Sequence, residues 1–423
     1  MKYITLFLSL FIYSTVSGQG QTKRALFLGN SYTQVNDLPK MIADAAASTG
    51  DVLIYDSNVP GGYTLQGHST NTTSLAKIAA GNWDYVVLQE QSQLPAFPIN
   101  QVQFQVFPYA QTLNNLITTQ NACAETVFYM TWGRKNGDAA NCGFLSALCT
   151  YEGMDSLLSA RYTMMANDND AILSPVGAVW KHLRQHSPAI NLYQADESHP
   201  SVAGTYAAAC TFYAALFRKD PTEITFSSTL SASDAAAIRA AAKLIVYDNL
   251  LAWNIGSYDP LAGFTPVLSG ANQVSFTNTS TNASEYFWSF GDGDTSTTAQ
   301  PTHTYAAPGQ YTVTLVASKC GQSDTLTQTV SISVNSTPAA TDAGFALSVY
   351  PNPATKTLTL QHTIPGNLRY KIVNLYGAQV QTGTVNAMQQ QLSVSSLADG
   401  LYFLQLLDGE KILGQQKFIK VSE

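Results

Sequence analysis

Residues 25–33 read Ala-Leu-Phe-Leu-Gly-Asn-Ser-Tyr-Thr. The apolar run predicts a buried strand, and the polar residues after it predict a turn that carries a hydroxyl, Ser31, at its tip. Residues 196–201 read Asp-Glu-Ser-His-Pro-Ser, which places a carboxylate three residues before an imidazole and just ahead of a predicted helix. Ser31, His199 and Asp196 together offer the nucleophile, the base and the base-orienting group of a serine hydrolase.

Strands and helices alternate over residues 19–256, which we interpret as one α/β domain. Asp37 is suited to be the N-cap of a helix that has Pro39 in its first turn. We expect strands at residues 24–29, 52–55, 83–88, 125–131 and 171–176, and Ala-rich amphipathic helices at residues 202–217 and 235–253. The alternation predicts a parallel sheet covered on both faces, with Ser31 at the strand ends where ligands gather.

Candidate oxyanion donors follow two other predicted strands. Gly61 and Gly62 come after the second strand, where a glycine lets a backbone N–H approach a substrate closely. Gln89 and Gln91 come after the third strand and offer side-chain amides. With the backbone N–H of Ser31, these groups are suited to hold a developing oxyanion.

The order of these segments resembles the SGNH/GDSL hydrolase family, which places Ser, Gly, Asn and His in four blocks on a flavodoxin-like α/β fold. The resemblance covers residues 24–218. It implies a three-layer sandwich and an esterase that acts on carboxylic esters without a metal or an organic cofactor. It assigns Ser31 as the nucleophile and matches Asp196 and His199 to the Asp-x-x-His block of the family.

Two blocks depart from the usual family pattern and resemble a divergent bacterial branch. The first reads Gly-Asn-Ser in place of Gly-Asp-Ser, and the third has Gln-Glu-Gln where the family usually has Gly-x-Asn. Gln91 falls in the Asn position and Gln89 is the competing choice for the oxyanion donor. Gly61 or Gly62 matches the glycine of the second block.

A polar segment with one Trp follows the fourth predicted strand and is expected at the same edge. Trp132 is suited to stack on a sugar ring, and Arg134 to pair with an anionic or polar substrate group. The alternative is an ordinary loop with a Trp in the core.

Composition excludes some classes of partner. The 423 residues carry a formal net charge of -7, only 12% of residues are charged, and no run of Lys and Arg exceeds two. A chain of this kind has no electrostatic basis for binding nucleic acid or for docking on an anionic membrane.

Residues 1–18 have the pattern of a signal peptide. Lys2 supplies a basic start, residues 4–16 form an apolar stretch too short to span a bilayer, and small residues precede a cleavage site before Gln19. No cysteine stands at that site, and no later segment is apolar for long enough to be a transmembrane anchor.

Export makes disulfides possible among the five cysteines. Cys142 and Cys149 would close a short loop and form the favoured pair, and a Cys123–Cys210 pair is the alternative. No cysteine spacing is typical of a zinc site.

The character of the sequence changes to short alternating segments after residue 256. Residues 264–334 contain Phe-Trp-Ser-Phe-Gly-Asp-Gly-Asp and resemble a PKD domain, an immunoglobulin-like β-sandwich. In it, Asp292 and Asp294 belong to a turn and offer possible calcium ligands. Residues 335–345 are a linker by composition. Residues 346–423 contain Tyr-Pro-Asn-Pro-Ala at 350–354 and Leu-Tyr-Phe-Leu at 401–404. They resemble the C-terminal sorting domain of the type IX secretion system of Bacteroidetes, a second small all-β unit.

These features together predict a secreted or cell-surface serine ester hydrolase. A carbohydrate ester is the favoured substrate, because secretion and a PKD domain both suit polysaccharide processing. The type IX secretion machinery is the expected partner. The alternative is a non-catalytic cell-surface carbohydrate-binding or adhesion protein that keeps the SGNH fold, which the altered third block favours.

Overall fold

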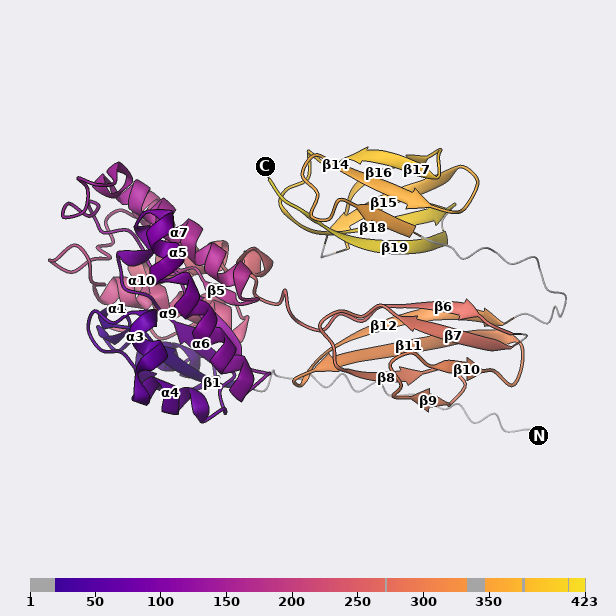
Figure 1. Cartoon of the computed structure of the whole chain (residues 1–423), viewed down its shortest axis with the longest axis horizontal. Helices are drawn as coiled ribbons and strands as arrows, with labels where there is room; N and C mark the ends of the chain where they lie inside the picture. The colour runs from indigo at the N-terminus through magenta and orange to yellow at the C-terminus, as the bar shows by residue number, and fades with distance from the viewer. Residues whose placement is uncertain (1–19, 271, 333–346, 375–376, 410, 423) are drawn as a thin grey trace, which may run out of the picture. The chain divides into compact units, whose positions relative to one another are not determined.

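The computed structural model describes residues 20–270, 272–332, 347–374, 377–409 and 411–422 (Figure 1). The chain divides into two units, Met1–Tyr258 and Asp259–Glu423. The predicted signal peptide at residues 1–18 and the predicted linker at residues 335–345 lie outside the described residues.

A five-stranded parallel sheet in the order β2-β1-β3-β4-β5 forms the centre of the first unit. The strands are β1 (Thr22–Leu28), β2 (Val52–Asn58), β3 (Tyr85–Leu88), β4 (Glu125–Tyr129) and β5 (Ile172–Ser174). All five were predicted, and their order is that of a flavodoxin-like fold. Alternate residues of β1 face opposite cores, Phe27 one and Leu26 the other.

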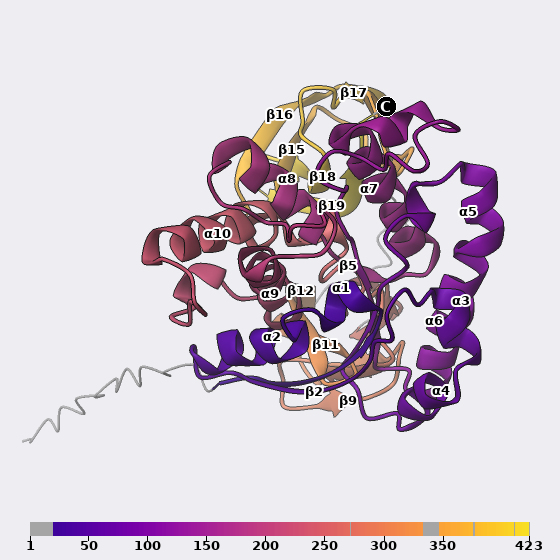
Figure 2. The ribbon, with the colours of Figure 1, turned by 90° about the vertical axis from the view of Figure 1, so that its left-hand side faces the viewer.

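Helices cover both faces of this sheet, as predicted (Figure 2). One face packs against α2 (Leu38–Ala47), α8 (Val176–His186), α9 (Val202–Phe217) and α10 (Ala232–Ile245). The other packs against α3 (Leu65–Thr70), α4 (Thr72–Ala79), α5 (Ile99–Gln105), α6 (Phe107–Gln120) and α7 (Tyr151–Asp168). Short helices lie at α1 (Ser31–Gln34), η1 (Leu94–Ala96), η2 (Ser146–Cys149), η3 (Pro221–Glu223) and η4 (Tyr247–Trp253).

Helix boundaries confirm some expectations and correct others. Asp37 is the N-cap of α2 and accepts the N–H of Lys40. Helix α9 has the predicted bounds but is not amphipathic, because it is buried on all sides between the sheet and its neighbouring helices. Residues 235–253 are not one helix. Asn249 has a non-helical backbone, and its side-chain amide donates to the carbonyl of Leu244 at 2.7 Å, which competes with helix continuation.

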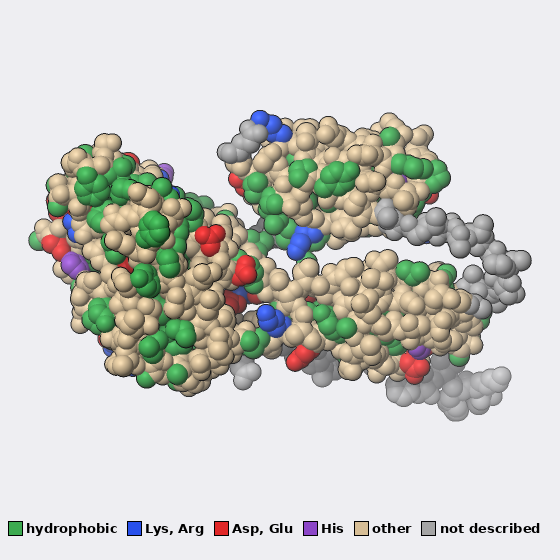
Figure 3. All heavy atoms as spheres, viewed as in Figure 1, with side chains coloured by type: hydrophobic (Ala, Val, Ile, Leu, Met, Phe, Trp, Pro, Cys, Tyr) green, Lys and Arg blue, Asp and Glu red, His purple; other side chains and the backbone are tan. Residues whose placement is uncertain are grey.

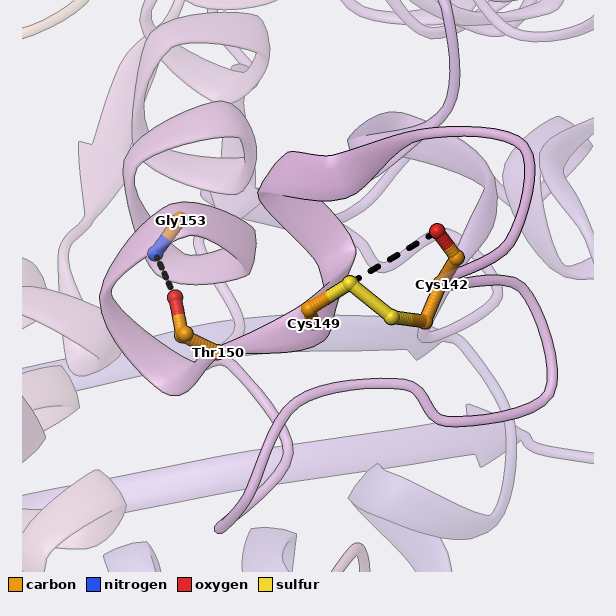
Figure 4. The surroundings of a disulfide bond; sticks show 4 residues. All are labelled: Cys142, Cys149, Thr150 and Gly153. Carbon is orange, nitrogen blue, oxygen red and sulfur yellow. Dashed lines mark hydrogen bonds between the residues drawn. A yellow bond between two sulfur atoms is a disulfide. The ribbon is translucent and has the colours of Figure 1, made fainter.

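The favoured disulfide, Cys142–Cys149, is confirmed (Figure 4). It closes a loop directly before α7, whose N-cap Thr150 accepts the N–H of Gly153 at 3.1 Å. The alternative pairing of Cys123 with Cys210 is wrong, because Cys210 is a free thiol buried in α9.

The second unit is all-β and contains two sandwiches. In each, one three-stranded and one four-stranded sheet share an apolar core, and one of these cores contains the fully buried Trp288. The first comprises β6 (Phe264–Leu268), β7 (Gln273–Asn278), β8 (Glu285–Ser289), β9 (Thr295–Ser296), β10 (Thr302–Thr304), β11 (Gly309–Lys319) and β12 (Gln322–Ile332). The second comprises β13 (Leu347–Tyr350), β14 (Thr357–His362), β15 (Leu368–Asn374), β16 (Gln379–Val385), β17 (Gln389–Ser393), β18 (Gly400–Asp408) and β19 (Lys411–Lys420).

The surface carries few charges. On the face shown in Figure 3, acidic and basic side chains are scattered among uncharged ones. Within the described ranges, no helix is both long enough and apolar enough to cross a bilayer.

Candidate active site

Ser31 lies where the chain leaves β1 and turns into α1. Strand β1 stands between β2 and β3, so this turn is at the point where the strand order reverses. Ligands of open α/β sheets bind in the crevice that forms there. Asn30 caps the turn by accepting the N–H of Tyr32 at 3.1 Å, which fixes Ser31 at the corner.

His199 reaches Ser31 from the loop between α8 and α9. Its Nε2 lies 2.9 Å from Ser31 Oγ, although the two residues are 168 positions apart in the sequence. Its Nδ1 is hydrogen-bonded to the carboxylate of Asp196. With Nδ1–H donating to that carboxylate, the lone pair of Nε2 faces the serine hydroxyl, as a general base requires.

The loop that carries Asp196 and His199 is a tight turn. Asp196 Oδ1 accepts the N–H of Ser198 at 3.1 Å and that of His199 at 3.0 Å, and Glu197 between them has a φ of 59°. Partial burial alone would raise the pKa of Asp196, but hydrogen bonds from the His199 ring and the two N–H groups hold this pKa below its usual value. The carboxylate therefore stays ionised and orients the imidazole.

Aromatic side chains pack behind the imidazole. The rings of Tyr32 and His199 meet edge to face, with centroids 5.4 Å apart, and the Tyr32 hydroxyl is hydrogen-bonded to Ser198 Oγ at 2.6 Å. Trp132 stacks on Tyr32 and donates from Nε1 to the carbonyl of Ser198 at 3.1 Å. The prediction that Trp132 stacks on a sugar is wrong, because its side chain is 0% exposed and belongs to the core.

Asn30 and Gln89 form a buried reciprocal pair next to Ser31. Gln89 Nε2 donates to Asn30 Oδ1 at 2.9 Å, and the backbone N–H of Asn30 donates to Gln89 Oε1 at 3.0 Å. Asn30 Nδ2 donates to the carbonyls of Tyr63 at 2.9 Å and Glu90 at 3.3 Å. An Asp at position 30 could not donate these two bonds, which explains the Gly-Asn-Ser sequence.

The two glutamines that sequence reasoning left open lie in different surroundings. Gln89 is 0% exposed and is occupied with Asn30. Gln91 lines the cleft beside Ser31, and its Nε2 donates to Gln93 Oε1 at 3.0 Å. Only Gln91 of the two borders the space that a substrate would enter.

The candidate glycines lie in an exposed turn after β2. Gly62 lines the cleft and has a φ of 70°, a conformation that favours glycine, and a Cβ added at Gly61 or Gly62 would meet no neighbour. The role of either N–H in holding an oxyanion stays a prediction.

Glu90 is a buried acid that sequence reasoning missed. Its side chain is 0% exposed and accepts the N–H of Gln91 at 2.6 Å and that of Leu65 at 3.2 Å. Burial raises its pKa to about 8, although these two N–H groups act in the opposite direction. It joins the loop after β3 to the start of α3. The only sequence signal was an acid two residues after the end of an apolar strand.

The cleft has a volume of about 250 Å³, and most of the residues that line it carry polar side chains. No aliphatic side chain is among its lining residues, which are Asn30, Ser31, Tyr32, Gly62, Gln91, Ser92, Arg134, Ser198 and His199. Arg134 is thus at the cleft, as predicted, and its Nη1 lies 3.2 Å from Asp138 Oδ1.

Within the described parts of the chain, one group of three side chains could hold a metal ion, and it lies in the second unit. The ligand atoms of Asp292, Asp294 and His303 are within 4.8 Å of one another. His303 Nε2 is hydrogen-bonded to Asp292 Oδ2 at 2.7 Å, so a hydrogen bond between β10 and the turn accounts for the arrangement.

Two family models match the second unit. Residues 262–334 match the PKD domain, and residues 348–421 match the secretion system C-terminal sorting domain. The pre-pro-metalloprotease PrtV of Vibrio cholerae serotype O1 is 41% identical over 87 residues, which are 19% of this chain and 9% of that protein. The chain therefore spans less than a tenth of the length of this curated relative.

Two solved structures are similar to larger parts of the chain. A DUF4886 family protein from Bacteroides uniformis is 20% identical, with a TM-score of 0.47, and the match covers 54% of this chain and 95% of that one. A candidate SGNH hydrolase from Slackia heliotrinireducens is 29% identical, with a TM-score of 0.37 and coverage of 45% and 97%.

The family models thus identify both predicted modules that follow the α/β unit. The chain carries a PKD domain and, after it, a type IX sorting domain, and is accordingly a secreted or cell-surface protein.

Proposed function

We propose that the α/β unit is a serine hydrolase that cleaves carboxylic esters. The observation that carries this proposal is the hydrogen-bonded series Ser31, His199 and Asp196, with 2.9 Å between Ser31 Oγ and His199 Nε2. Nucleophile, base and orienting carboxylate come from two distant segments and meet at the switch point of the sheet. If Ser31 only belonged to a polar turn and Asp196 only capped a helix, nothing would require the two segments to come together.

The reaction proceeds through an acyl-enzyme. Ser31 Oγ attacks the ester carbonyl while His199 Nε2 takes the hydroxyl proton, and the imidazolium then gives this proton to the leaving alkoxide. A water molecule next loses a proton to His199 and attacks the acyl carbon, and Ser31 leaves with that proton. Asp196 keeps the imidazole oriented and stabilises its charge in both steps.

The oxyanion of each tetrahedral intermediate needs donors that are already in place. The backbone N–H groups of Ser31 and Gly62 and the amide of Gln91 border the same cleft and are our candidates. Gln91 would exchange its bond to Gln93 for one to the oxyanion.

The small cleft, which has no aliphatic lining residue, favours a short acyl group. Long acyl chains bind apolar walls, and the lining residues include no aliphatic side chain. We propose an acyl ester of a carbohydrate as the substrate, because a hydroxylated alcohol suits polar walls and because the chain is exported with a PKD domain.

The test is an acyl-length series of 4-nitrophenyl esters with the purified chain. We expect turnover to be highest for acetate and to fall as the chain lengthens. Ser31→Ala should lose at least about a thousandfold in kcat/KM, because the members of a triad act as a unit. Ser233→Ala, an exposed serine on α10, is the matched control.

A fluorophosphonate probe separates an enzyme from a binding protein with the same fold. The proposal predicts covalent labelling at Ser31, located by mass spectrometry, with loss of labelling in Ser31→Ala. Intact chain without label, together with no turnover of any ester, would leave the binding alternative.

A further inference from the structure

Arg134 is a cleft residue that ester chemistry itself does not require. It lines the same space as Ser31 and His199, and the reaction described above assigns it no proton and no oxyanion. Its side chain is 28% exposed, so the guanidinium is partly desolvated but reachable. Apart from His199, it is the one basic residue among those that line the cleft.

A buried carboxylate fixes this guanidinium. Arg134 Nη1 lies 3.2 Å from Oδ1 of Asp138, whose side chain is 0% exposed. Asp138 Oδ2 accepts a hydrogen bond of 2.6 Å from each of Gln93 and Asn141. These bonds fix the Asp138 carboxylate, and this carboxylate in turn holds Arg134 in place before any substrate arrives.

The disulfide loop supports the anchor. The backbone N–H of Asp138 donates to the carbonyl of Leu148 at 2.7 Å, and Leu148 lies directly before Cys149 of the Cys142–Cys149 bridge (Figure 4). The bridge therefore stiffens the segment that holds the backbone of Asp138.

The protein does not use the full hydrogen-bonding capacity of Arg134. Among the described residues, its side chain makes one hydrogen bond, from Nη1, and its Nε is buried without a partner. A guanidinium has five N–H donors, and a carboxylate is the acceptor that matches its planar geometry and charge. Gln91 and Ser92 line the same cleft and are suited to bind uncharged hydroxyl groups of a substrate, which do not need a guanidinium.

We propose that Arg134 selects esters that carry a carboxylate near the ester bond, such as acyl esters of acidic sugars. This inference rests on the proposed function and deepens it. The carboxylate belongs either to the alcohol or to the acyl part of the substrate. Both have the same recognition chemistry, and the test has one arm for each.

The first experiment compares charged esters with neutral ones of similar shape. For the alcohol arm, kcat/KM for 4-acetoxybenzoate is divided by that for its methyl ester. For the acyl arm, the value for 4-nitrophenyl hydrogen succinate is divided by that for the methyl succinate. In one arm we expect a ratio of roughly 10 to 100 in wild type, typical of a charge-assisted hydrogen bond.

Arg134→Gln should bring that ratio to about one, and Arg134→Lys should keep part of it, because a lysine retains the charge without the planar fork. Lys40→Gln removes the same charge from the exposed side of α2 and should leave the ratio unchanged. Equal ratios in wild type and in Arg134→Gln would overturn the proposal.

Arg134→Gln leaves the buried Asp138 without its cation and can unfold the loop. The double variant Arg134→Gln/Asp138→Asn removes both charges and retains amide hydrogen bonds to Gln93 and Asn141. A folded double variant, checked by circular dichroism, should also have a ratio of about one. A ratio that stays at its wild-type value in this variant would equally overturn the proposal.

A binding measurement separates the failure of this inference from failure of the proposed function. In Ser31→Ala, calorimetry should detect binding of at least one of the two carboxylate esters. Its affinity should be at least about tenfold lower when Arg134→Gln/Asp138→Asn is added. That result, with no hydrolysis by wild type, would refute the esterase and keep the anion site. Hydrolysis of neutral esters without this difference in affinity would do the reverse.

Discussion

The two halves of the proposed active site are built in opposite ways. On the nucleophile side, Asn30, Gln89 and Glu90 are at most 2% exposed and are joined by hydrogen bonds to one another and to neighbouring backbone. On the base side, the side chains of Asp196 and His199 are 46% and 30% exposed. Buried hydrogen bonds fix the nucleophile side, whereas the backbone of a short turn fixes the base side.

This difference separates two effects that substitutions usually mix. A buried polar group that loses its partner costs about 1–3 kcal/mol of folding free energy, whereas an exposed one is hydrated instead. We therefore expect substitutions on the base side to change turnover with little effect on stability. Substitutions on the buried side should change stability first.

The largest expected effect is on the base side. His199→Ala should lower kcat/KM for 4-nitrophenyl acetate by about a thousandfold or more, because Ser31 loses its proton acceptor. Asp196→Asn should cost roughly 10- to 100-fold less than this, since the imidazole remains. Urea denaturation should place both variants within about 0.5 kcal/mol of wild type. A His199→Ala variant that keeps a tenth of the activity would disprove this assignment of the base.

The two glutamines after β3 give the sharpest test of the comparison. Gln91→Ala should lower kcat by roughly 100- to 1000-fold, typical of a lost oxyanion donor. It should cost less stability than Gln89→Ala, because Gln91 is only partly buried and water can replace the bonds that its Oε1 accepts from the N–H groups of Gln93 and Leu94. Gln89→Ala should instead lower the free energy of unfolding by about 1–3 kcal/mol, because it strands the buried groups of Asn30. Steady-state kinetics and urea titrations on the same samples measure both effects. A large loss of kcat in Gln89→Ala and a loss of stability alone in Gln91→Ala would assign the oxyanion donor to Gln89 instead.

The sequence predicts the base side better than the nucleophile side. Asp196 and His199 are three residues apart, so their hydrogen bond is a local property of one turn. The bond between Asn30 and Gln89 joins residues 59 positions apart, and it exists only because β1 and β3 are neighbours in the sheet. No short stretch of sequence indicates which strands are neighbours, so this bond could not be predicted from the sequence.

The order of the strands and the burial of Trp132 have the same origin. Apolar segments predict all five strands of the sheet, but only the family resemblance implies the order in which they pair. Trp132 follows a strand in a polar segment, which is typical of a surface loop. Its ring is nevertheless buried, because Tyr32 and Trp180 stack on its two sides in the folded chain.

Glu90 should make the buried half sensitive to pH. Its pKa is about 8 in the folded chain, against an ordinary value of 4.5. Between these two pH values the unfolded chain releases the proton and the folded chain keeps it, so stability falls as pH rises, by up to about 1.4 kcal/mol per unit. Above about pH 8 this loss stops. Glu90→Gln should remove that slope.

Urea midpoints from pH 5 to pH 9 measure this effect, with Glu152→Gln as the control for an exposed glutamate. The difference in stability between Glu90→Gln and wild type should grow in favour of the variant as pH rises. Parallel curves of stability against pH for the two proteins would contradict this prediction, because they would show that the pKa of Glu90 is the same in the folded and unfolded chain.

The last prediction concerns Asn30→Asp, which gives the Gly-Asp-Ser sequence of the family that the α/β unit resembles. The new carboxyl would face the carbonyls of Tyr63 and Glu90, to which the amide now donates. We expect about 1–3 kcal/mol lower stability at neutral pH, from lost donors and a desolvated charge. Acid should reduce the penalty, because a protonated carboxyl donates one of the two bonds again. Asn115→Asp makes the same exchange at an exposed residue of α6 and should cost less at every pH. Urea denaturation of both variants measures this difference. If the two variants were equally stable, hydrogen bonding to buried carbonyls would not be the reason for asparagine beside Ser31. The two halves of the site would then differ in solvent exposure alone.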